Sequence, residues 1–179
     1  MPRQMYASDN MVTEEIMSNT ATQIDAISSL NGWLQGLTGM YVADITAIPD
    51  DKLDWCPGGC ARTAKSITTE VIGMCYYTAA ILKGQEPSME EMEAMSSNLG
   101  DLDTKAKMID AFQAGTKAMS EALATADSET LNKVITPPWQ MDAPVYMIAQ
   151  IMVNHIWYHD GQLNYIQALL GDEKVHWMG

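Results

Sequence analysis

Apolar residues recur at steps of three and four positions along most of the chain. This spacing is typical of amphipathic helices, whereas no segment of useful length shows the strict alternation of a strand. Glycine and proline interrupt the pattern and divide it into long segments. The pattern predicts an all-α protein, a four-helix bundle, with its long helices at residues 11–47, 61–83, 101–126 and 143–170.

The connections between these segments carry recognisable turn and cap residues. Ser88 followed by Glu91 has the spacing of a capping box and predicts a short acidic helix over residues 88–98, between the second and third long helices. Gly171 stands where the last helix is expected to end in a left-handed cap. We expect residues 1–179 to form a single domain, with residues 171–179 as a C-terminal tail.

Charge removes two classes of partner. The chain has 179 residues, with 10 Lys and Arg against 23 Asp and Glu, so its formal net charge is −13. Nucleic-acid binding needs clustered basic side chains, which the sequence lacks. An anionic membrane surface would repel the chain for the same reason. We therefore expect neither nucleic acid nor membrane as a partner.

Cysteine usage and the N-terminal sequence favour a cytoplasmic protein. Three cysteines cannot all pair within one chain. The first residues lack the basic and then apolar pattern of a secretory signal. No uninterrupted apolar run reaches the roughly 18 residues that a membrane-spanning helix needs. These features predict a soluble protein in a reducing compartment.

Two histidines on the last predicted helix are the strongest candidates for chemistry. His155 and His159 are four residues apart, about 40° apart around the helix, and so lie on one face. Ile148, Met152 and Ile166 fall on the same face, which predicts that both imidazoles point into the core. Two buried imidazoles are either satisfied as core residues or bind one metal ion together, and we favour the ion.

Glu70 is the candidate third ligand, on the second predicted helix. It lies in the middle of that helix's apolar stripe, where an unpaired carboxylate would be costly. Either it completes a divalent-metal site with the two histidines, or it forms a buried ion pair with Arg62 or Lys65. Two histidines and one carboxylate are a ligand set of zinc hydrolases and non-haem iron enzymes.

Five further residues have open roles at this stage. Gln162 and Tyr158 border the histidine pair, and Gln162 is the better placed to orient a ligand or a bound water. Cys56 and Cys60 are either a redox or metal pair or simply flank the Pro-Gly-Gly turn between them. His176 in the tail is either a further ligand or part of a surface segment.

Residues 154–171 carry a family resemblance. The pattern His-x-x-x-His-x-Gly-Gln-Leu, from His155 to Leu163, resembles the last helix of the DinB/YfiT-like superfamily. Trp55 and Pro57 resemble the Trp-x-Pro segment that precedes the family's second helix. The resemblance implies an up-down-down-up bundle, often a homodimer, with a divalent metal bound by three histidines. His155 and His159 match two of these, while Glu70 stands where many members have the third.

The resemblance also implies an activity. Characterised members use a metal ion to activate a low-molecular-weight thiol, so a metal-dependent thiol S-transferase or hydrolase-like enzyme is expected, with Zn, Ni, Fe or Mn as the ion. The alternative is a non-catalytic dimeric binding or stress-related protein with the same bundle. The sequence does not identify the substrate.

Overall fold

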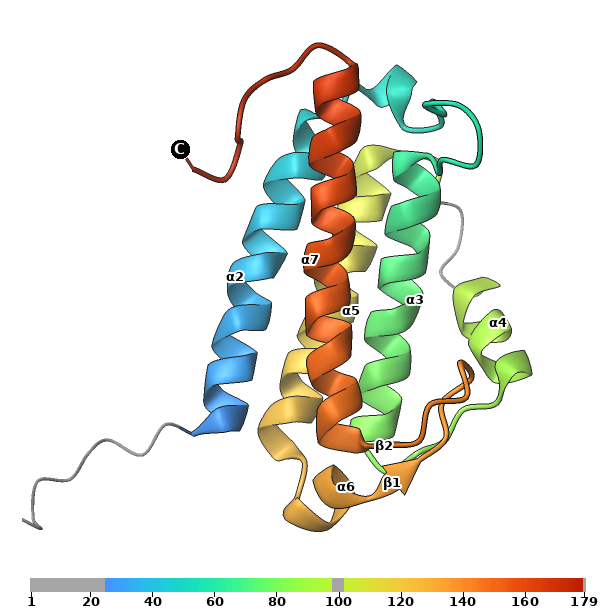
Figure 1. Ribbon diagram of the computed structural model, residues 1–179, viewed down its shortest axis with the longest axis vertical. Coiled ribbons are helices and arrows are strands. Elements are labelled where there is room, and N and C mark those ends of the chain that lie inside the picture. The colour runs from blue at the N-terminus through green and yellow to red at the C-terminus, as the bar shows by residue number, and fades with distance from the viewer. Residues whose placement is uncertain (1–24, 98–101, 179) are drawn as a thin grey trace, which may run out of the picture.

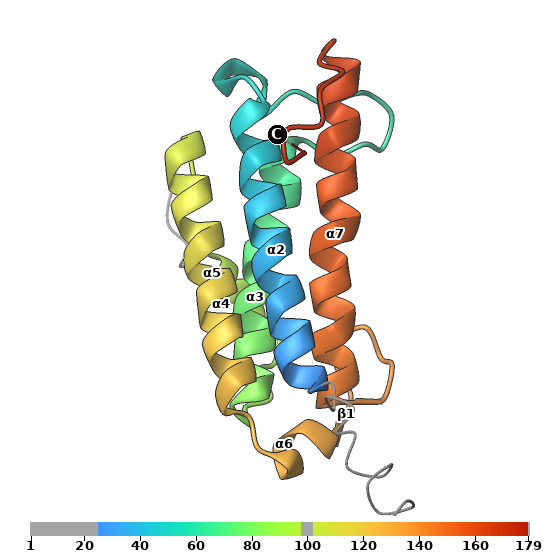
Figure 2. The ribbon, with the colours of Figure 1, turned by 90° about the vertical axis from the view of Figure 1, so that its left-hand side faces the viewer.

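The computed structural model describes residues 25–97 and 102–178 and is mostly helical. Four long helices lie side by side in this part of the chain, as Figures 1 and 2 show: α2 (Ala26–Ala47), α3 (Ala64–Leu82), α5 (Lys105–Thr125) and α7 (Val145–Leu169). The predicted helices are confirmed in type and approximate place. Residues 11–24 of the first predicted helix lie outside the described residues.

Helices α3 and α5 begin later than the apolar pattern predicts because of their N-cap residues. The Thr63 side chain accepts a hydrogen bond from the backbone N–H of Ser66, and Thr104 does the same for Lys107. Each hydroxyl satisfies an N–H that has no partner within the helix, so α3 and α5 begin at the next residue. Gly171 has a φ of 89° and ends α7, as predicted.

Shorter elements join the long helices. The predicted acidic helix is present as α4 (Met89–Ser97), and Ser88 and Glu91 form the expected reciprocal capping bonds. The sequence analysis did not predict the others, which are too short to produce a periodic pattern. They are the 3-10 turn η1 (Asp50–Lys52), the helix α6 (Ser128–Asn132) and the strands β1 (Val134–Ile135) and β2 (Ala143–Pro144). The two strands pair antiparallel.

The core lies between the four long helices. Helices α2 and α3 each contact both α5 and α7. Tyr41 of α2 and Phe112 of α5 are fully buried and stack with their ring centroids 4.5 Å apart. Met108 and Met119 are also fully buried, so these methionines are ordinary core residues. The contact of α3 with α7 brings their facing side chains together.

A buried polar cluster lies where α7 meets α2. Asp44 of α2 is fully buried and Asp160 of α7 is 3% exposed. Asn164 donates a 2.6 Å hydrogen bond to Asp44 Oδ2, and Gln167 donates one of 2.6 Å to the Asp44 carbonyl. Burial and the neighbouring Asp44 carboxylate raise the pKa of Asp160 to about 8. Asp160 therefore faces α2 and not the neighbouring helix α3.

None of the helices within residues 25–97 and 102–178 is both long enough and apolar enough to span a bilayer.

Candidate metal centre

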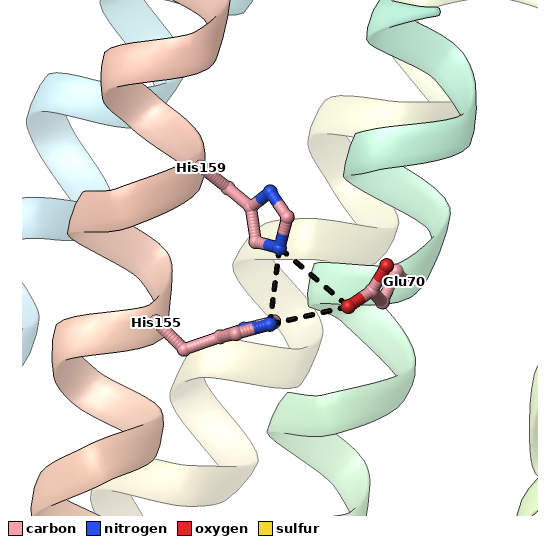
Figure 3. A group of neighbouring side chains, drawn as sticks. All are labelled: Glu70, His155 and His159. Carbon is pink, nitrogen blue, oxygen red and sulfur yellow. Dashed lines mark hydrogen bonds and ion pairs between the residues drawn. The ribbon is translucent and has the colours of Figure 1, made fainter. Parts of the chain in front are cut away.

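Three side chains from two helices converge between α3 and α7 (Figure 3). His155 and His159 project from successive turns of α7, and Glu70 projects from α3. The two Nε2 atoms are 3.0 Å apart, and Glu70 Oε1 lies 3.2 Å from His155 Nε2 and 3.5 Å from His159 Nε2. The structure thus brings together the three residues that the sequence analysis selected.

Gln162 determines how His159 presents its ring. The Gln162 Oε1 atom accepts a 2.7 Å hydrogen bond from His159 Nδ1, so the ring proton sits on Nδ1. The Nε2 lone pair then points toward His155 and Glu70. The His159 side chain is only 4% exposed, which holds the ring in this orientation. Histidines that bind a metal commonly donate the N–H of their other ring nitrogen to such an acceptor.

His155 is held in its neutral form. Burial disfavours the charged imidazolium, and the neighbouring His159 disfavours it further, so the pKa of His155 is lowered. A neutral imidazole is the form that binds a metal. Its Nδ1 is buried and has no hydrogen-bond partner among the residues that the structure describes.

Glu70 is less buried than the sequence analysis expected. Its side chain is 37% exposed, and Arg62 donates a hydrogen bond from Nη1 to Glu70 Oε2. Burial opposes ionisation of Glu70, but the hydrogen bond and charge of Arg62 outweigh it and lower its pKa. The alternative of an ion pair with Arg62 is therefore realised, and it occurs together with the histidine contacts. Lys65 instead pairs with Asp54, at 3.6 Å.

The geometry fits a divalent ion. Nitrogen ligands about 2.0–2.1 Å from a tetrahedral zinc ion lie roughly 3.3 Å from one another. The spacings of 3.0, 3.2 and 3.5 Å between the three candidate ligand atoms bracket this value. Two imidazole nitrogens and one carboxylate oxygen suit Zn, Ni, Fe and Mn. The residues present can therefore hold such an ion, with further positions open to a substrate.

The remaining candidates lie at the edge of the centre or away from it. The Tyr158 ring is 63% exposed and meets His159 edge-on, with 5.0 Å between ring centroids. His176 pairs with Asp172 at 2.7 Å, within the C-terminal tail. Cys56 and Cys60 are exposed free thiols, and Cys56 donates a 3.2 Å hydrogen bond to the Ala61 carbonyl.

A small pocket adjoins the centre, and the sequence analysis did not identify it. Its volume is about 210 Å³, and it lies between the connector that precedes α3 and the C-terminal half of α7. Arg62 and Gln162 line it, and these residues bind Glu70 and His159, so the pocket shares a wall with the centre. The sequence feature that could have indicated the pocket is the Pro-Gly-Gly turn at residues 57–59. Gly58 adopts a φ of 118° there, which favours glycine.

The fold and the cluster together define a helical bundle with a two-histidine, one-carboxylate centre between two of its helices. Comparison with solved structures places this bundle among DinB-like folds. A DinB-like protein (YjoA) from Bacillus subtilis is similar with a TM-score of 0.61 and 14% identity, over 81% of this chain and 94% of that one.

The mycothiol-dependent maleylpyruvate isomerase has a similar fold as well. A histidine-to-alanine mutant of that enzyme gives a TM-score of 0.65 and the unmutated enzyme 0.59, each at 10% identity over 78% of this chain. The chain spans 61% of the length of that isomerase. No family model matches the sequence, and no curated protein matches it significantly. The resemblance to the DinB/YfiT-like superfamily is thus confirmed at the level of the fold.

Proposed function

We propose that the protein is a divalent-metal-dependent enzyme that activates a low-molecular-weight thiol for transfer to an electrophile. Glu70, His155 and His159 would hold the ion. The observation that carries the proposal is the convergence of their three ligand atoms, all within 4.8 Å of one another. The thiol is favoured over a hydrolytic water because one protein of similar fold is a mycothiol-dependent isomerase. The same centre would also serve a hydrolase-like reaction.

The chain's own residues would prepare the centre for this chemistry. A bound divalent ion supplies positive charge that lowers the pKa of a thiol or water beside it. Gln162 keeps the proton of His159 on Nδ1 and so leaves Nε2 free. Arg62 keeps Glu70 ionised through its second oxygen. Both interactions exist before any substrate arrives.

A thiol-conjugation assay tests the proposed function. Protein loaded with Zn, Ni, Mn or Fe(II) is mixed with cysteine, glutathione, mycothiol or bacillithiol and with monochlorobimane, and adduct fluorescence is followed. We expect at least one combination to exceed the protein-free rate by about 100-fold or more, in the range of metal and general acid–base effects. The His159→Ala variant should give the protein-free rate.

If every loaded form gives only the protein-free rate with all four thiols, the thiol-transferase proposal is wrong. The alternative of a non-catalytic binding or stress-related bundle then stands in its place. Retention of the full rate by His159→Ala would equally contradict the assignment of the centre.

We also propose a homodimer of bundles with up-down-down-up topology, in a reducing, cytoplasmic setting. The gradient of colour along α2, α3, α5 and α7 in Figure 1 supports this order of directions. Exposed aromatic rings support self-association: Trp33 of α2 and Trp157 of α7 are in contact, with centroids 4.7 Å apart. The free state of all three cysteines supports the reducing setting. Sedimentation equilibrium measures the mass.

Replacing Gln162 by Leu should weaken metal binding about 10- to 100-fold, the usual cost of removing the partner of a ligating histidine. The change removes the oxygen that accepts from His159 Nδ1 at 2.7 Å and leaves the carbon volume nearly unchanged. Competition titration with a fluorescent zinc chelator measures the affinity. The Gln162→Glu variant keeps an acceptor at this position and should stay within about 3-fold of the wild type. Equal affinity in Gln162→Leu and the wild type would show that this hydrogen bond plays no part.

A further inference from the structure

The pocket beside the metal centre contains one charged side chain among the residues that line it. That side chain is Arg62, and its neighbours in the pocket include Cys60, Ile67, Gln162, Tyr165 and Ile166. We propose that this pocket binds the carboxylate group of a small organic acid, with Arg62 as the residue that recognises it. The proposal deepens the proposed function, since the bound acid would lie next to the metal centre.

Arg62 has an N–H donor left over for a ligand. A guanidinium group has five N–H bonds. In the structure Nη1 donates to Glu70, Nε donates to Ser66 Oγ at 3.3 Å, and Nη2 donates to the Ser66 carbonyl at 2.7 Å. Nη2 also lies 3.4 Å from Ser66 Oγ, so up to four of the five N–H bonds are directed at these acceptors, which leaves one, on Nη1, for an incoming carboxylate. Arg62 can therefore bind an acid without releasing Glu70.

The existing contacts also hold the guanidinium in place. Glu70 binds Arg62 through Oε2 and faces both imidazoles through Oε1, as Figure 3 shows for the imidazole side. The Arg62 side chain is 37% exposed, so a ligand can reach it from solvent. An arginine already ordered by its neighbours loses little conformational entropy when it binds a second anion. The geometry therefore favours recognition by Arg62 over a merely structural ion pair.

The other walls suit a short carbon chain. Ile67 of α3 and Ile166 of α7 are each 2% exposed and provide apolar surface, and the Tyr165 ring borders them. A volume of about 210 Å³ equals that of about seven water molecules at liquid density. This is enough for a three-carbon acid or for the carboxylate end of a larger molecule. An apolar wall with one fixed polar anchor is the usual composition of a small-molecule site.

A chain with this many acidic residues needs a specific positive group in order to bind an anion. The net charge of −13 repels anions in general, so an anionic ligand needs a specific positive partner. Lys65, in the first turn of α3, is paired with Asp54 at 3.6 Å and is not among the residues that line the pocket. A divalent ion at the neighbouring centre would add positive charge on the same side. Arg62 and that ion together would attract a carboxylate.

Isothermal titration calorimetry on the full chain tests the pocket, with two matched pairs of probes. In the zinc-loaded protein, 3-mercaptopropionate should bind at least about 10-fold more tightly than the neutral 3-mercaptopropanamide, as expected for a charge-assisted hydrogen bond. In the metal-free protein, propionate should likewise bind more tightly than propionamide. The Arg62→Gln variant should lose both preferences and still bind the amides as the wild type does.

The control variant is Lys65→Gln, which also removes one positive charge, from the first turn of α3 and outside the pocket. It should keep both preferences, and a circular-dichroism melt checks that each variant is folded. Equal binding of acid and amide by the wild type, or an unchanged preference in Arg62→Gln, overturns the proposal. If no zinc binds at all, the proposed function fails, whereas a propionate preference that is lost in Arg62→Gln still supports the pocket.

Discussion

Replacing His159 by Ala is expected to reduce bound metal from about one ion per chain to nearly none. The change removes one of the three proposed protein ligands and with it a direct bond to the ion. The loss of affinity should therefore exceed the 10- to 100-fold that is typical when only a hydrogen-bond partner of a ligand is removed. His159 is the most buried of the three ligands and the one that Gln162 orients, so no other side chain replaces it at that position. Elemental mass spectrometry of protein purified and then dialysed against zinc measures the stoichiometry.

His176→Ala is the matched control for this experiment. It removes an imidazole that pairs with Asp172 in the tail and is not part of the three-residue cluster. The control should retain about one ion per chain, since the ligands are unchanged. Equal metal content in His159→Ala and the wild type would mean that the ion binds elsewhere. A metal-free wild type after zinc dialysis would contradict the centre altogether.

Replacing Asp160 by Asn is expected to stabilise the protein increasingly as the pH rises. Asp160 keeps its proton in the folded state up to about pH 8, because burial and Asp44 raise its pKa. The unfolded chain releases that proton near pH 4. Between these values the unfolded state binds fewer protons, so the free energy of unfolding of the wild type falls as pH increases. An asparagine amide donates to Asp44 at every pH and removes this loss.

The expected gain at pH 9 is about 1–3 kcal/mol in the free energy of unfolding, the scale for relieving a buried unpaired charge. Urea denaturation of the metal-free protein at pH 5, 7 and 9 measures it. Asp110→Asn is the control, because Asp110 is an exposed aspartate of α5 and its replacement changes the net charge equally. If Asp160→Asn shows no more gain than Asp110→Asn at pH 9, Asp160 does not retain its proton in the folded state as expected.

Periodicity was sufficient to predict the helices because most of their buried residues recur on one face. The positions of His155 and His159 on the apolar stripe of α7 follow from that periodicity. The meeting of α7 with Glu70 of α3 does not, and was expected from the bundle architecture and the family resemblance. The first residues of α3 and α5 do not follow from periodicity, because the side-chain hydroxyls of Thr63 and Thr104 determine where these two helices begin. The pairing of β1 with β2 is also invisible to periodicity.

The environment of Glu70 shows where helical-wheel reasoning stops. The wheel places Glu70 on the buried face, but its side chain is 37% exposed, and Arg62 of the connector before α3 reaches one of its oxygens. The wheel also treats Arg62 and the histidines as competing partners of Glu70. A carboxylate has two oxygens, and the structure uses one for Arg62 and the other for the imidazoles.

The hydrogen bonds of Arg62 to Glu70 and of His159 to Gln162 have a consequence for how the proposed centre would acquire an ion. Each bond holds a candidate ligand through an atom other than the one that would bind the ion, Oε2 of Glu70 and Nδ1 of His159, so the chain's own contacts position these ligands. We therefore expect the proposed centre to load by exchange with the surrounding pool of ions after the bundle has folded. In such a case the ion that a preparation contains follows supply and the Irving–Williams order of affinities. Preparations grown with different trace metals should therefore differ in their ion and agree in their melting behaviour.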